Sequence, residues 1–179
     1  MDQEELYYRR FLAGDDEAMT ALVKACRPGL CAYLFTIVRD RDLAEDLTED
    51  TFVKLLLKRP RSTGKASFKT WLYTIGRNLA CDRLRKDGRR GETFAALPED
   101  LPDRRFDPAA ALSEKADRQA LYAALLRLHP PYRQVLWLIY FEDFSVKECA
   151  RILKKSPNAV SVLHRRAKEA LKKELEKEL

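Results

Sequence analysis

The sequence is poor in the residues from which catalytic and metal sites are usually built. Its 179 residues include only two histidines and four cysteines, and the cysteines (Cys26, Cys31, Cys81 and Cys149) form no Cys-x-x-Cys pair. A histidine-based metal site or a Ser-His-Asp triad therefore has little to build on, so a hydrolase or transferase is the least favoured class and we expect no cofactor. Scattered cysteines of this kind are typical of free thiols in a reducing cytoplasm.

Glycine and long apolar runs are also scarce. Only six glycines occur, and they form no glycine-rich loop of the kind that cradles phosphates. No run of 18 apolar residues is present, so no membrane span is predicted, and the acidic start (residues 1–5) does not resemble a signal peptide. With 46% hydrophobic and 35% charged residues, the chain is predicted to be a soluble, helix-rich protein of one or two small domains.

Apolar periodicity predicts helices and no strands, so the expected fold class is all-α. Near the N-terminus, helices are expected over 4–13 and 17–25, with a third restarting at Pro28. Asp42 and Glu45 resemble a capping pair at the start of a fourth helix, which runs to about Lys58. Its apolar stripe consists of Leu43, Leu47, Phe52, Leu55 and Leu56. Its exposed side is expected to be acidic and consists of Glu45, Asp46, Glu49 and Asp50.

The most informative stretch is the helix predicted to begin after Ser67, a plausible N-cap, and to stop near Gly88. One face is apolar, with Trp71 at its edge, and consists of Phe68, Leu72, Ile75 and Leu79. The opposite face has short polar side chains and two arginines, and it consists of Thr70, Thr74, Arg77, Asn78, Cys81 and Arg85. Arginines suit phosphates, whereas asparagine and threonine suit base edges, so this face is predicted to bind a nucleic-acid strand.

The local charge supports this prediction. Residues 61–90 contain nine Lys and Arg against two Asp, a net charge of +7, whereas the whole chain carries +6. One segment therefore accounts for the entire basic excess. A solvated, basic surface helix that binds nothing is the alternative interpretation.

The sequence predicts two helical domains, 1–90 and 113–179, joined by a linker over 91–112 that contains three prolines. In the second domain, Ser145 and Glu148 form a capping box, and Ser156-Pro157 is an N-cap followed by proline at the first helical position. A short helix, a tight turn and a long helix are typical of a helix-turn-helix, although an ordinary helical hairpin has the same pattern. The candidate groove-reading and phosphate-binding residues of the long helix are Ser156, Asn158, Ala159, Ser161, Val162, Arg165, Arg166 and Lys168.

Together these segments resemble bacterial RNA polymerase sigma factors of the extracytoplasmic-function (ECF) group. Residues 42–52 (DLAEDLTEDTF) look like the family's core-binding helix, and residues 68–84 (FKTWLYTIGRNLACDRL) look like its −10 helix. Residues 131–135 (PYRQV) and 144–150 (FSVKECA) look like its fourth region. The departures are Glu49 where the family usually has Gln, Leu56 where Trp is frequent, Ser161 where a basic residue is frequent, and His164 where an apolar residue is usual.

The resemblance implies a transcription initiation factor that is not itself an enzyme and that acts in the cytoplasm. The implied partners are core RNA polymerase (the β′ coiled coil and the β subunit), promoter DNA in double- and single-stranded form, and an anti-sigma factor. The implied polymerase-binding residues are Asp46, Leu47, Glu49, Asp50 and Phe52. The implied −10 residues are Lys69, Thr70, Tyr73, Thr74, Arg77, Asn78 and Arg85. The loop before the −10 helix and Asn78 would hold a flipped base, the last helix would read the −35 element, and the linker would thread the polymerase.

The rival interpretation is an autonomous helix-turn-helix repressor or activator that needs no polymerase. The acidic helix over 42–58 and the basic segment over 61–90 favour the sigma factor, because a plain repressor needs neither. His164 follows Val160 by four residues, and we therefore expect it to be a half-buried packing residue rather than a DNA contact.

Overall fold

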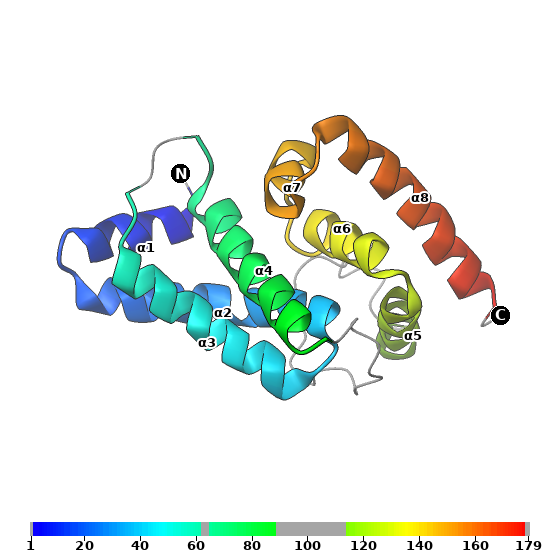
Figure 1. The fold of residues 1–179 in the computed structure, drawn as a ribbon, viewed down its shortest axis with the longest axis horizontal. Helices are drawn as coiled ribbons and strands as arrows, with labels where there is room; N and C mark the ends of the chain where they lie inside the picture. The colour runs from blue at the N-terminus through cyan, green and yellow to red at the C-terminus, as the bar shows by residue number, and fades with distance from the viewer. Residues whose placement is uncertain (1, 62–64, 89–113, 178–179) are drawn as a thin grey trace. The chain divides into compact units, whose positions relative to one another are not determined.

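The computed structural model describes residues 2–61, 65–88 and 114–177, and these residues contain helices and no strands (Figure 1). The chain divides into two compact units, Met1–Phe94 and Ala95–Leu179. The all-α prediction is confirmed. The division falls inside the predicted linker over 91–112, all of which lies outside the described residues. Unit 1 contains α1 (Gln3–Leu12), α2 (Asp16–Val38), α3 (Arg41–Lys58) and α4 (Phe68–Lys86). Unit 2 contains α5 (Glu114–Arg127), α6 (Pro130–Tyr140), α7 (Val146–Leu153) and α8 (Pro157–Glu176).

Helix α2 is the central element of unit 1, and α1, α3 and α4 all pack on it. From Ala32 to Val38 every residue of α2 is buried, as expected of a helix that is surrounded on all sides. By length and composition α2 would be long enough to cross a membrane, but more than half of its apolar stretch is buried inside the unit. It is therefore the core helix of unit 1.

The predicted break between residues 25 and 28 is wrong, because α2 continues through Pro28. Proline inside a helix costs about 3 kcal/mol through its missing N–H and the clash of its ring with the preceding turn. Leu22, Cys26 and Leu30 are buried on both sides of the proline, whereas Pro28 itself is exposed. Burying side chains of this size stabilises by ~1.5–3 kcal/mol each, so tertiary packing outweighs the local signal.

Helix α3 begins one residue earlier than predicted, and its cap differs. The carboxylate of Asp40, not that of Asp42, accepts the N-terminal hydrogen bond, from the backbone N–H of Leu43 at 3.1 Å. Leu43, Leu47, Phe52 and Leu55 are buried as the apolar stripe predicts, whereas Leu56 is 38% exposed. The predicted cap of α4 is confirmed, since Ser67 Oγ accepts from the N–H of Thr70 at 3.2 Å.

The buried face of α4 is rotated from the predicted one. Phe68 and Leu72 are buried as expected, but Ile75 and Leu79 are only half-buried, and Tyr73, Gly76 and Ala80 complete the core face. Gly76 explains the rotation. A Cβ atom at this position would lie 3.0 Å from Leu30 Cδ1 and 3.3 Å from Thr51 Oγ1, so glycine lets α4 approach α2 and α3 closely. The periodicity of apolar side chains cannot reveal a contact that depends on having no side chain.

Unit 2 is built around α6, whose residues Arg133 to Leu138 are all buried. Trp137 stacks on Phe141 with ring centroids 4.4 Å apart, and Tyr122 of α5 packs against both rings. Arg133 Nη1 donates to the carbonyl of Leu128 at 3.0 Å, which caps the C-terminal end of α5. The four cysteines are free thiols, and burial raises the pKa of Cys149 in α7 to about 12, so that thiol stays protonated and unreactive.

Candidate nucleic-acid interface

The turn between α7 and α8 gives unit 2 its helix-turn-helix. The capping box is present as predicted: Ser145 Oγ accepts from Glu148 N–H at 3.3 Å, and the Glu148 carboxylate accepts from Ser145 N–H at 2.8 Å. Helix α7 ends at Leu153, and its C-cap Lys154 adopts a left-handed conformation with φ of 55°. Ser156 then caps α8 through the N–H of Ala159 at 3.1 Å, with Pro157 at the first helical position. Only Lys154, Lys155 and Ser156 separate the two helices, so the turn is tight and fixed at both ends.

The first turns of α8 present their side chains to solvent, as a recognition helix requires. Val160 and Ala167 hold the helix against the unit, while the predicted DNA-facing residues lie on the other side. Val162 is half-buried, and the exposed residues are Ser156, Asn158, Ala159, Ser161, Arg165, Arg166 and Lys168. Ser161 Oγ donates to the carbonyl of Pro157 at 3.1 Å, whereas the Asn158 amide has no hydrogen-bond partner among the described residues.

His164 fastens α8 to α6. Its Nε2 lies 3.1 Å from Tyr140 Oη, and it is half-buried as predicted. Burial, with a further contribution from Lys168, lowers the pKa of this imidazole below its usual value, so the ring is neutral at pH 7. A neutral, engaged imidazole supplies no charge to a phosphate, which agrees with the predicted packing role.

The exposed side of α4 is the second candidate surface, and two of the residues implied for −10 binding do not lie on it. Thr70 and Tyr73 are each 1% exposed. The prediction that Thr70 lies on an exposed polar face is therefore wrong, and Tyr73, a −10 residue implied by the resemblance, lies in the core. Thr70 Oγ1 bonds to Ser67 Oγ at 2.8 Å, and Tyr73 packs against Tyr33 with centroids 5.4 Å apart. Both lie where the close approach at Gly76 turns the helix toward the core, and in this conformation neither side chain reaches a nucleic acid directly.

The remaining predicted residues of α4 all keep some exposure to solvent. Lys69, Thr74, Arg77 and Asn78 are half-buried, and Arg85 is exposed near the end of the helix. Thr74 Oγ1 donates its proton to the carbonyl of Thr70 at 2.8 Å, so this hydroxyl can act toward a ligand only as an acceptor. The Asn78 amide has no hydrogen-bond partner within the described part of the chain. Arg83 and Arg85 form ion pairs with Asp87 and Asp82 on the exposed surface, where such pairs are weak and can be exchanged for phosphates.

Helix α3 carries a third surface with two chemical halves. Asp46, Glu49 and Asp50 are exposed as predicted, whereas Leu47 and Phe52, also predicted as contact residues, are 3% and 6% exposed and lie in the core. Both residues belong to the apolar stripe that packs α3 against α2 and α4, so neither side chain is open to a partner. Arg27 of α2 lies 3.5 Å from Glu49, whose side chain is 67% exposed.

The apolar half of this surface was not among the features predicted from the sequence. Val53 and Leu57 are 51% and 81% exposed, and they continue the row of Asp46 and Asp50 along the helix. The spacing 46, 50, 53, 57 is the signal that would have found them. Val53 and Leu57 lie one helical turn apart, so they form a small exposed apolar patch beside the acidic residues.

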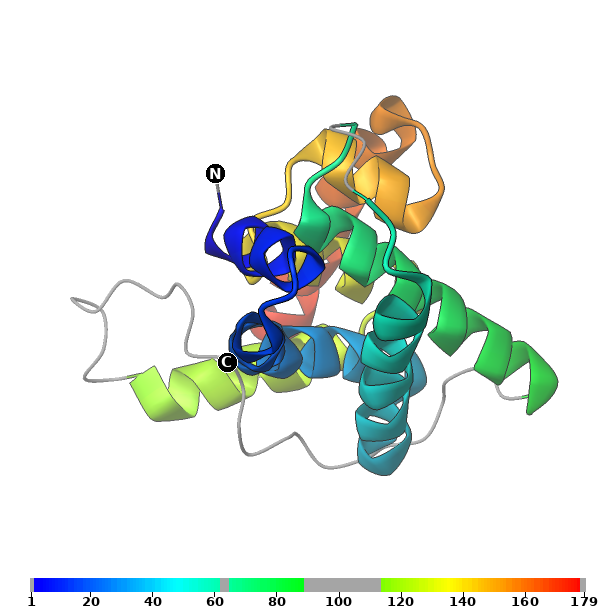
Figure 2. The same ribbon diagram turned by 90° about the vertical axis from the view of Figure 1, so that its left-hand side faces the viewer.

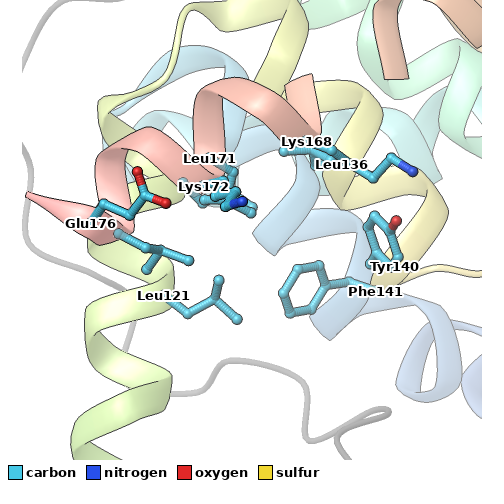
Figure 3. Close-up of a pocket in the computed structure, with 10 residues that line it drawn as sticks. Leu121, Leu136, Tyr140, Phe141, Lys168, Leu171, Lys172 and Glu176 are labelled. Carbon is cyan, nitrogen blue, oxygen red and sulfur yellow. The ribbon is translucent and has the colours of Figure 1, made fainter. Parts of the chain in front are cut away.

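Unit 2 also contains an apolar groove of about 580 Å³, separate from the recognition turns (Figure 3). Leu121 of α5, Leu136 and Phe141 from α6 and its end, and Leu171 of α8 form its apolar walls. Tyr140 and three charged residues of α8 lie at its margin; these are Lys168, Lys172 and Glu176. The N-terminal half of α8 therefore carries the predicted DNA-facing side chains apart from Lys168, while its C-terminal half, with Lys168, forms part of a groove.

In residues 2–61, 65–88 and 114–177, no three His, Cys, Asp or Glu side chains lie close enough together to hold a metal ion. The surfaces described above are two faces that carry cations and amides, on α4 and α8, and one acidic and apolar face, on α3.

Comparison with known proteins gives the same division. The Sigma-70 region 2 family model matches residues 22–90, and the Sigma-70 region 4 model matches residues 118–171. The chain is 34% identical to the RNA polymerase sigma factor YlaC of Bacillus subtilis (strain 168), over 81% of this chain and 84% of YlaC. It is 27% identical to the ECF RNA polymerase sigma factor SigX of the same organism, over 90% of this chain and 85% of SigX.

A solved structure is similar in fold as well. The sigma factor RpoE from Bartonella quintana, crystallised in complex with the anti-sigma factor NepR, superimposes with a TM-score of 0.68 and 25% identity. The superposition covers 88% of this chain and 96% of that chain. The family models, the relatives and the two helical units agree with one another, and this chain therefore belongs to the ECF group of the sigma-70 family of RNA polymerase sigma factors, which bind core RNA polymerase and direct it to promoters.

Proposed function

We propose that α8 reads the −35 promoter element through the exposed side chains of its first two turns. The observation that supports this most is the rigid turn that joins α7 to α8, since caps fix both of its ends. The Asn158 amide, which has no hydrogen-bond partner among the described residues, offers a donor and an acceptor at the position where a recognition helix meets base edges. Arg165 and Arg166 follow within two turns and would hold phosphates, which positions the helix without reading sequence.

The exposed side of α4 would bind the −10 element and help to open it. Extruding a base from a duplex costs a few kcal/mol, which hydrogen bonds and stacking in a receiving pocket must offset. Asn78 can donate and accept on one base edge, and Lys69, Arg77 and Arg85 supply positive charge along the same helix. Thr70 and Tyr73 would act from the core, by holding α4 in position.

The two-part surface of α3 would dock on the β′ coiled coil of core polymerase. Its acidic half, Asp46 to Asp50, suits a basic partner, and Val53 and Leu57 provide apolar contact area at the other end. This arrangement combines electrostatic steering with an apolar anchor, as protein interfaces commonly do.

An anti-sigma factor is the proposed regulatory partner, as it is for RpoE from Bartonella quintana. The apolar groove between α5, α6 and α8 suits the apolar face of a helix of such a protein. Lys168 and Lys172 at the margin of the groove favour a helix that also carries acidic side chains. Because transcription takes place there, we expect the protein to act in the cytoplasm.

The substitution Asn78→Ala tests the assignment of α4. It should leave polymerase binding and closed-complex formation near normal while reducing strand opening on a duplex promoter, measured by permanganate reactivity of −10 thymines. A template already mismatched over the −10 element should recover much of the lost run-off transcript, because unpairing no longer has to be driven by the protein. If the variant opens duplex promoters as well as the parent does, the role given to this face of α4 is mistaken.

A further inference from the structure

Helix α1 lies outside the residues that match the region 2 family model. It nevertheless contacts Pro60, just after α3, and Phe68, the first residue of α4. In Figures 1 and 2, α1 lies beside the N-terminal end of α4. Three of its side chains make these contacts, and they are Glu5, Tyr8 and Phe11. Each contact joins residues about 50 or more positions apart in the sequence, so no local propensity specifies it.

Tyr8 is the central contact. It is 1% exposed, and its hydroxyl donates to the backbone carbonyl of Pro60, just after α3 ends. Its ring stacks on Phe68, the first residue of α4, with centroids 4.6 Å apart, and meets Trp71 edge-on at 6.0 Å. One side chain therefore holds the exit of α3 and the entry of α4 together. Burial, followed in size by the nearby charge of Glu5, raises the pKa of this phenol to about 12, so the donor keeps its proton.

Glu5 holds the same end of α4 by a different interaction. Its Oε2 accepts from the backbone N–H of Phe68 at 3.2 Å, one of the N-terminal amides that has no partner inside the helix. A carboxylate at this place also interacts favourably with the positive end of the helix dipole. The side chain is 12% exposed, and its Oε1 lies 3.2 Å from Arg9 Nε, so it is fixed from both sides.

Phe11 completes the contact on the α3 side. It is 4% exposed, and the guanidinium of Arg59 lies 5.0 Å from the centre of its ring. Arg59 has a left-handed backbone with φ of 37°, which marks the point where the chain leaves α3. A hollow of about 220 Å³ remains between Tyr8, Pro60, Ala66, Phe68 and Trp71.

We propose that Glu5 and Tyr8 are positioning residues for −10 opening, which act by fixing Pro60 and the first turn of α4 relative to each other. The inference rests on the proposed function of α4. A pocket that must offset the cost of base extrusion works best when its parts are already in place, because ordering them during opening would consume part of the binding free energy. Neither residue needs to touch DNA for this effect.

The test uses full-length protein assembled with core polymerase, and compares Tyr8→Phe with the parent. This substitution keeps the ring stack and removes only the hydroxyl. Tyr7→Phe is the matched control, because Tyr7 is the neighbouring half-buried residue and its hydroxyl has no partner among the described residues. Losing one hydrogen bond should slow opening of a duplex promoter by about three- to tenfold and leave a template mismatched over the −10 element nearly unaffected. Glu5→Gln, with Glu4→Gln as its control, should give a smaller loss of the same kind.

Two results would overturn the inference. One is equal loss on duplex and mismatched templates, or a parallel loss of affinity for core polymerase, which would mean that Tyr8 merely supports the fold. The other is unchanged opening by both Tyr8→Phe and Glu5→Gln. Asn78→Ala run beside them separates the inference from the function on which it rests. If Asn78→Ala impairs opening and the α1 variants do not, only the inference fails; if none of the three impairs it, the proposed role of α4 fails as well.

Discussion

The close packing at Gly76 makes a prediction whose sign can be worked out from the structure. At an unhindered position inside a helix, Gly→Ala stabilises by ~1 kcal/mol, because alanine loses less backbone entropy on folding. In Gly76→Ala the new methyl group would lie 3.0 Å from Leu30 Cδ1, 3.3 Å from Thr51 Oγ1 and 3.4 Å from Leu34 Cδ2. All three neighbours are fully buried and have little room to move, and overpacking of this kind costs ~1–3 kcal/mol. We therefore expect a net loss of about 1 kcal/mol in the free energy of unfolding of unit 1.

Hydrogen exchange measured by mass spectrometry resolves this effect by segment. Amides of α2 and α4 should exchange faster in Gly76→Ala, while those of unit 2 serve as an internal control and should not change. The double variant Leu30→Val/Gly76→Ala removes the nearest methyl group, so it should be less destabilised than the sum of the two single changes by about 0.5–1 kcal/mol. Stabilisation of unit 1 by Gly76→Ala, or strict additivity in the double variant, would refute the explanation given for the close approach of α4.

Three further predictions concern separate surfaces. Asp46→Arg should weaken binding of core polymerase in a fluorescence titration while changing the free energy of unfolding by only ~0.5 kcal/mol, because Asp46 is exposed; unchanged affinity would remove α3 from the docking surface. Changing Asn158 should alter base preference at one or two −35 positions by ~1–3 kcal/mol, whereas Arg166→Ala should weaken all sequences alike and flatten the salt dependence by about one unit; a uniform loss in both would rule out direct reading by Asn158. The Tyr8 phenol has a folded pKa of about 12 against a usual value of 10.0, so its contribution to the stability of unit 1 is complete below pH 10 and is lost as the pH rises toward 12. Ring-carbon NMR should find Tyr8 still protonated at about pH 11, and ionisation at its usual pKa would contradict the burial described for it.

Much of this fold is predictable because its helices carry strong local signals. Ser67, Ser145 and Ser156 all cap the helices that they were predicted to cap, since a capping hydroxyl needs only the three residues that follow it. The exposed positions of α8 are likewise predictable, because α8 packs through one narrow stripe that includes Val160 and Ala167.

The features that the sequence did not reveal depend on tertiary packing. The continuity of α2 through Pro28 is set by the helices around it, and the burial of Thr70 and Tyr73 follows from the close approach at Gly76. The contacts of Glu5 and Tyr8 with the entry of α4 join distant parts of the chain. The exposed pair Val53 and Leu57 was missed for another reason: an apolar residue on a helix is ordinarily assigned to the core, and only its neighbours show otherwise.

Run-off transcription with purified core polymerase on a pool of random promoter sequences tests the central claim most directly. The protein together with core polymerase should yield transcripts whose templates share a −35 and a −10 element, and the protein alone should bind the same duplexes weakly and with little sequence preference. Tight, sequence-specific binding by the protein alone, with no transcript when core polymerase is added, would contradict the account and favour an autonomous helix-turn-helix regulator.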